Sequence, residues 1–141
     1  MKNVTIGIFG AISSGVAYLF GGWDASLATL LIFMLIDYVS GVIVAGVFHN
    51  SPKTASGALC SRIGWKGLAK KCMTLAFVVI ACRVDLVIGA NITRDAVCIA
   101  FIVNELISII ENAKLMGVPI PAPISKAIDL LNSKAEEQKE E

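Results

Sequence analysis

Charged residues are scarce in this sequence. Of its 141 residues, 16% are Asp, Glu, Lys or Arg, whereas 56% are hydrophobic. Soluble domains average about 25% charged and about 45–50% apolar residues. A soluble chain of this length could not hide so much apolar surface in its own core, so the composition favours a membrane protein.

The sequence also lacks the residue patterns of enzymes and metal sites. Its single histidine, His49, has no ligand cluster near it in the sequence. No Ser/His/Asp set, phosphate-binding loop or zinc spacing occurs. We therefore expect no catalytic residue, no metal, no cofactor and no nucleic-acid partner. The cysteines form no C-x-x-C pair, and we expect them to be small hydrophobic residues kept reduced: Cys60, Cys72, Cys82 and Cys98.

Long apolar runs, in contrast, are abundant. They cover residues 4–20, 27–47, 72–89 and 95–110. A membrane-spanning helix needs roughly 20 residues, and the runs are too long for strands. The sequence predicts an all-α integral membrane protein with about four transmembrane helices. Three spans are the alternative, because Arg83 and Asp85 interrupt the third run, which would then lie at the membrane interface.

The distribution of basic residues predicts the orientation. Residues 48–71 contain Lys53, Arg62, Lys66, Lys70 and Lys71 and no acid. Loops rich in Lys and Arg stay in the cytoplasm. With four spans both termini are then cytoplasmic, whereas three spans leave the C-terminus outside. We expect Lys66, Lys70 and Lys71 to lie at the inner membrane interface.

The C-terminal part changes in character after a proline-rich stretch. We expect residues 1–123 to form the transmembrane domain, and Pro119, Pro121 and Pro123 to stop its last helix. Apolar residues at helical spacing then predict a short amphipathic helix over residues 124–133. Residues 134–141 are charged and are expected to be a disordered tail.

One acid lies at the centre of the second run. Asp37 would cost about 2.5–3.5 kcal/mol in a lipid-facing position, so it must face protein or water, or be protonated. Gly41 and Ala45 follow on the same helix face, and small residues allow helices to approach closely. Asp37 is either a helix-contact or pore position, or a structural hydrogen-bonding group without a role in permeation.

The fourth run carries a polar stripe. Steps of three, four and seven residues place its members on one side of a helix: Asn104, Glu105, Ser108, Glu111 and Asn112. Such a stripe cannot face lipid. It faces other subunits or a water-filled lumen, or it packs against helices of its own chain.

Three stretches together resemble a known family. The first is Asp37-Tyr38-x-x-Gly41-x-x-x-Ala45, and the second is Ser61…Gly64-x-x-Gly67-Leu68-x-Lys70-Lys71. The third is Arg94-Asp95, then Asn104-Glu105-x-x-Ser108-x-x-Glu111-Asn112, ending in Gly117-Val118-Pro119-Ile120-Pro121. The chain is similar over residues 37–121 to the bacteriophage holin family that includes the clostridial toxin-secretion and phage-lysis holins.

The resemblance implies a function that the residues alone do not. A holin assembles with copies of itself in the bacterial cytoplasmic membrane and opens holes. A cell-wall hydrolase (endolysin) or a signal-less toxin then escapes, without stable contact with the holin. Two alternatives remain open: a small ion or solute channel, in which Asp37 and Glu105 bind ions, and a holin antagonist or membrane scaffold.

Overall fold

The structure is a computed structural model that describes the backbone of residues 2–140 and the side chains of residues 4–130 and 133. Its regular elements are α1 (Lys2–Leu19), α2 (Ala25–Gly46), α3 (Ser61–Ile88), α4 (Thr93–Leu115) and α5 (Ala122–Glu140). The prediction of an all-helical chain is confirmed for the described residues.

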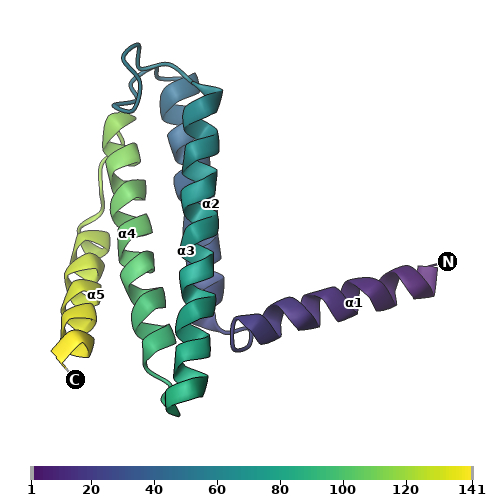
Figure 1. Cartoon of the computed structure of the whole chain (residues 1–141). Coiled ribbons are helices and arrows are strands. Elements are labelled where there is room, and N and C mark those ends of the chain that lie inside the picture. Colours follow the sequence, from purple (N-terminus) through teal and green to yellow (C-terminus); the bar gives the residue numbers. More distant parts are fainter. Residues whose placement is uncertain (1, 141) are drawn as a thin grey trace.

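Helices α2, α3 and α4 form an antiparallel bundle (Figure 1). Helix α4 is its centre, since it packs against α2, α3 and α5. Residues 47–60 and 116–121 lie at one end of the bundle, here called the loop end. Residues 20–24 and 89–92 lie at the opposite end, the junction end. Helix α5 runs back alongside α4, whereas α1 points away from the bundle at a steep angle.

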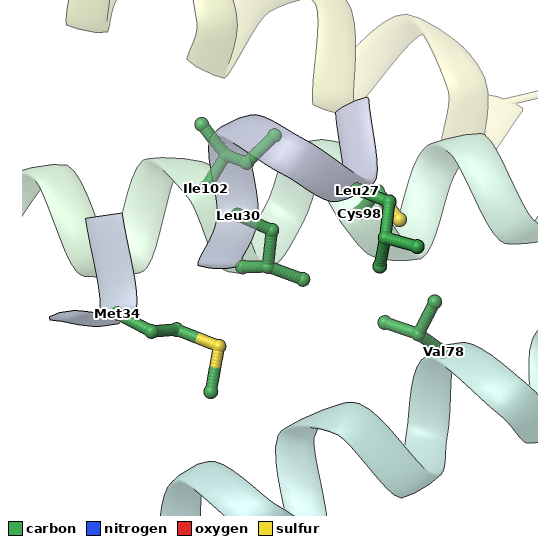
Figure 2. Packing of buried hydrophobic residues seen from close by; sticks show 6 residues of the cluster. All are labelled: Leu27, Leu30, Met34, Val78, Cys98 and Ile102. Atoms are coloured by element: carbon green, nitrogen blue, oxygen red, sulfur yellow. The ribbon is translucent and has the colours of Figure 1, made fainter. Parts of the chain in front are cut away.

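The bundle is held by a small apolar core in its junction half. Leu27, Leu30 and Met34 of α2 meet Val78 of α3 there, together with Cys98 and Ile102 of α4 (Figure 2). On α2 and α4 these residues follow the three- and four-residue steps that define one side of an α-helix. The apolar periodicity therefore decides which side of each helix turns inward.

The outside of the bundle is also apolar. Large hydrophobic side chains cover it, with Leu35 of α2 exposed by 64% and Leu86 of α3 by 65%. A continuous apolar exterior of this kind is typical of a surface in contact with lipid. Among the described residues, α2 and α4 are long and apolar enough to cross a membrane, and α1 contributes a shorter apolar helix.

The third and fifth helices differ in extent from the sequence expectation. Helix α3 begins at Ser61, so four of the five basic residues of the segment 48–71 are helical and only Lys53 lies in the loop. Helix α5 extends to Glu140, past the range expected for the amphipathic helix. Residues 134–140 are strong helix formers, which lets the helix continue without an apolar side. Residue 141 lies outside the described residues, and the division of the chain into domains stays a prediction.

Candidate functional site: a charged cluster inside the bundle

One ammonium group joins all three helices of the bundle. The Lys71 Nζ of α3 donates to Asp37 Oδ2 of α2 at 2.8 Å. It also donates to Glu105 Oε2 of α4. The side chains of Lys71, Asp37 and Glu105 are exposed by only 13%, 14% and 6%. Two carboxylates thus share one cation in a largely buried position.

The three charged residues meet near mid-height of the bundle. Each lies nine or ten residues from the loop end of its helix. At about 1.5 Å per residue this is about 15 Å, roughly half the thickness of a hydrocarbon core. A charge at that depth is costly unless it is paired inside the protein, faces a water-filled cavity or extends along its side chain to the interface.

Asn112 extends the cluster toward the loop end. Its Nδ2 donates to Asp37 Oδ1 at 3.1 Å and to Ser40 Oγ at 2.9 Å. A Cβ atom added at Gly41 would lie 3.7 Å from that same nitrogen. This is an ordinary van der Waals distance, so Gly41 packs against the amide of α4 and an alanine would also fit there. Ala45, one turn further, is buried at 7% exposure.

The predicted polar stripe of α4 is divided by the fold. Glu105 and Asn112 are buried and bind α2 and α3, and Ser108 is half-buried between them. Asn104 and Glu111 are exposed, and Glu111 lines a cleft at the loop end. Glu105 and Asn112 therefore pack against helices of their own chain, which is one of the two alternatives for the stripe. A subunit-facing or lumen-facing role of the whole set stays a prediction.

The basic residues of α3 are also divided. Lys66 and Lys70 are exposed and line a cleft at the loop end. Lys71, expected at the inner interface with them, instead turns inward to the two acids. One residue along an α-helix is a rotation of about 100°, which is enough to separate Lys70 from Lys71.

A second charged cluster closes the junction end. Arg94 of α4 is 8% exposed, and its Nη1 lies 2.5 Å from Asp24 Oδ2. Its Nε donates to the carbonyl oxygen of Phe20 at 2.6 Å. The hydrogen bond from Arg94 holds the pKa of the Asp24 carboxyl below its ordinary value. Arg94 thus fixes the chain between α1 and α2.

The start of α4 is capped from the neighbouring helix. The Asp85 carboxylate accepts hydrogen bonds from the backbone nitrogens of Thr93 and Arg94, at 3.0 and 2.9 Å. Arg83, two residues earlier, stacks on the Tyr18 ring with its guanidinium carbon 5.0 Å from the ring centre. The two charges in the third apolar run therefore have separate partners, as their spacing indicates.

Sequence reasoning missed the partners Lys71 and Arg94. A usable signal existed for Lys71, because two acids inside apolar runs require a cation within reach. It is the base nearest the middle of its helix among the four at positions 62, 66, 70 and 71. Arg94 gave no such signal, since its main acceptors are backbone oxygens and an acid 70 residues away.

An apolar exterior around internally paired charges defines a helical membrane protein. Comparison with known proteins gives the family. The bacteriophage holin family matches residues 14–133, and the chain belongs to it. This confirms the resemblance found in the sequence. Holins are membrane proteins without enzymatic activity. No solved structure matches the chain.

Individual relatives agree with the family. A protein named probable holin, of Bacillus phage phi105, is 31% identical over 133 residues, covering 94% of this chain and 92% of that protein. An uncharacterised protein of Listeria monocytogenes is 40% identical over 133 residues, covering 94% and 87%. An uncharacterised 14.9 kDa protein of Clostridium perfringens is 37% identical over 139 residues, covering 95% and 99%.

Proposed function

We propose that this protein oligomerises in the bacterial cytoplasmic membrane and forms holes that release a cell-wall hydrolase or a signal-less toxin. Membership of the holin family supports the class of activity. The relative named probable holin comes from a phage, for which release of a hydrolase is the expected task. The cargo follows from the family resemblance and not from any contact in the chain.

The outward position of Asn104 carries the proposal of self-association. This amide lies near mid-height of α4 and is exposed beside Ile107, which is itself 39% exposed. It has no hydrogen-bond partner among the described residues. A polar group exposed to hydrocarbon costs several kcal/mol if unsatisfied, roughly the energy of the bonds it loses. A neighbouring copy that offers a partner removes that cost.

We propose that the loop end faces the cytoplasm. Lys53, Arg62, Lys66, Lys70 and Lys114 all lie there, whereas the turn at residues 89–92 has no Lys or Arg. This distribution follows the positive-inside rule. Trp65 at the loop end and Trp23 at the junction end are 71% and 66% exposed, as expected for rings at the two membrane interfaces.

The number of spans depends on α1 and α3. We propose that α3 crosses beside α2 and α4, with Lys71 neutralised inside and the other bases of its first turns at the inner interface. Helix α1 crosses only if it turns back toward the bundle. Gly21 and Gly22, with φ of 76° and 106°, form the turn at which it leaves. With that crossing the N-terminus is cytoplasmic. The C-terminus is cytoplasmic as well when α5 leaves its position along α4 and lies at the inner interface.

The channel alternative has less support from the geometry. Asp37 and Glu105 would have to bind a mobile cation, but Lys71 already occupies a carboxylate oxygen of each. The geometry does not distinguish an antagonist from a holin, and a measurement of activity does.

Induced expression tests the proposal. Three cultures are compared. One expresses this chain alone, one expresses a signal-less cell-wall hydrolase alone, and one expresses both. We expect a sudden loss of membrane potential with the chain, and lysis only when both are present. Continued growth with both would indicate an antagonist or scaffold. Depolarisation without passage of the hydrolase would indicate a small channel.

A further inference from the structure

A cleft opens between α2, α3 and α4 at the loop end. It encloses about 840 Å³ and reaches from the inter-helix loop down to the charged cluster. Helices α2 and α3 pack against α4 but touch each other little, which leaves the space between them open. Ligand sites in proteins typically enclose about 300–1,000 Å³.

Apolar residues line the cleft between the inter-helix loop and the charged cluster. Val42 and Ala45 of α2 line one side, and Ile63, Gly64 and Gly67 of α3 line the other. A Cβ atom added at Gly67 would meet nothing within 4 Å, so the cleft is empty beside it. This part of the cleft is suited to a hydrocarbon chain rather than to an ion.

The rim of the cleft is basic. Five lysines and two carboxylates line the cleft as a whole, a net charge of +3. Lys71 is neutralised by Asp37 and Glu105. The four other lysines form no ion pair among the described residues, and Glu111 is the one carboxylate beside them: Lys53, Lys66, Lys70 and Lys114. The Tyr38 hydroxyl, 3.5 Å from a Cβ placed on Gly64, also has no hydrogen-bond partner among the described residues.

We propose that this cleft binds one anionic phospholipid of the inner leaflet. The lysines on the rim and the Tyr38 hydroxyl bind the phosphate headgroup. An acyl chain lies between α2 and α3 along Val42 and Gly67. Basic pockets between membrane helices on the cytoplasmic side are known to select anionic headgroups. The proposal rests on the proposed orientation only in assigning the inner leaflet.

The apolar wall is tested by filling it. Gly67→Leu places a side chain in the empty cleft without changing any charge. Gly46→Leu is the matched control, because it is also a helical glycine with nothing within 4 Å of its added Cβ but does not line the cleft. The basic rim is tested with Lys66→Gln/Lys70→Gln. Its control is Arg62→Gln/Lys126→Gln, which removes the same charge from exposed positions outside the cleft.

The measurement uses the full chain in nanodiscs of phosphatidylethanolamine with a trace of photoactivatable phosphatidylglycerol. We expect the labelled lipid to crosslink to residues 60–71. Unlabelled phosphatidylglycerol should compete and remove these crosslinks, whereas phosphatidylethanolamine and inorganic phosphate should not. Gly67→Leu should lower crosslinking at least about fivefold, and Lys66→Gln/Lys70→Gln about twenty-five-fold, which is about fivefold per lysine. Both controls should match the parent.

Three results would overturn the inference. They are equal competition by phosphatidylethanolamine, competition by inorganic phosphate, and equal crosslinking of Gly67→Leu and Gly46→Leu. Circular dichroism of each variant in detergent excludes loss of helix as the cause. The assay needs no lysis, so a chain that binds the lipid without opening cells contradicts only the holin function. A chain that lyses cells without selective crosslinking contradicts only the lipid site.

Discussion

The ammonium of Lys71 lies 2.8 Å from the carboxylate of Asp37, a residue 34 positions earlier in the chain. The same ammonium binds Glu105, 34 positions later. A single cation therefore connects α2, α3 and α4 at mid-height. Because two carboxylates depend on it, Lys71 is the residue whose removal should harm the bundle most.

We predict that Lys71→Met destabilises the protein by about 3–5 kcal/mol, since it leaves two buried acids without their cation. The measurement is the rate at which buried Cys98 reacts with a maleimide in detergent, in a background without the other cysteines. Lys70→Met is the control, because Lys70 is exposed and has no ion pair among the described residues. Equal Cys98 protection in both variants would mean that the cluster contributes little.

Asn104→Leu should leave the bundle folded and weaken assembly. An interhelical hydrogen bond in a membrane contributes about 0.6–2 kcal/mol. Its loss at each subunit contact should therefore reduce the size of the oligomer. Crosslinking in membranes measures oligomer size, and depolarisation after induction measures opening. Ile107→Leu, also on the exposed side of α4, should be silent. Oligomers of parental size in Asn104→Leu would remove the main support for self-association through this side.

Glu105 should behave differently from its neighbour Asn104. Glu105→Gln retains the Asp37–Lys71 pair and makes the cluster neutral, so we expect a folded chain that inserts at least as well as the parent. Membrane fractionation and Cys98 protection measure this. If Glu105→Gln abolished assembly while Asn104→Leu did not, the buried part of the stripe would be the subunit contact.

The topology is tested with single cysteines in a cysteine-free background. Asn91→Cys lies in the turn at the junction end, Ser56→Cys in the inter-helix loop, and Ser133→Cys in α5. An impermeant maleimide should label intact cells only at position 91. Labelling at position 133 without labelling at 91 or 56 would support the three-span arrangement, which leaves the turn at residues 89–92 inside.

The Asp24–Arg94 pair predicts a pH dependence at the junction. The pKa of Asp24 is lowered by the hydrogen bond from Arg94. An acid with a lowered pKa adds stability above its ordinary pKa of about 3.9, which is lost as the pH falls through the lower folded value. The Asp24 side chain is 45% exposed, so the contribution is small.

Distance measurements between spin labels on α1 and α4 check this dependence. We expect an unchanged distance distribution from neutral pH down to about pH 4, and a broader one in stronger acid. Asp24→Asn should broaden it at neutral pH, because the amide removes the charge that Arg94 binds. An unchanged distance distribution in Asp24→Asn would mean that the hydrogen bond from Arg94 to the Phe20 carbonyl holds the junction without the Asp24 charge.

The sequence by itself determined the class of this protein. Apolar runs of helical length and few charges require helices in a membrane, because only there is such an exterior stable. The polar residues inside those runs, Asp37 and Glu105 among them, were identifiable for the same reason, and helical spacing added Asn112 to them. The family, too, was recognisable from the spacing of these residues.

Only the tertiary structure decided how the polar residues pair. Helical periodicity predicts that Asn104 and Glu105 share a stripe, but α2 and α3 lie against one edge of it, so Glu105 is buried and Asn104 is exposed. Lys70 and Lys71 are likewise adjacent in the sequence and separated by the rotation of α3. A position on a helix follows from local spacing, whereas a partner follows from which helices pack together, and that depends on contacts between residues far apart in the chain.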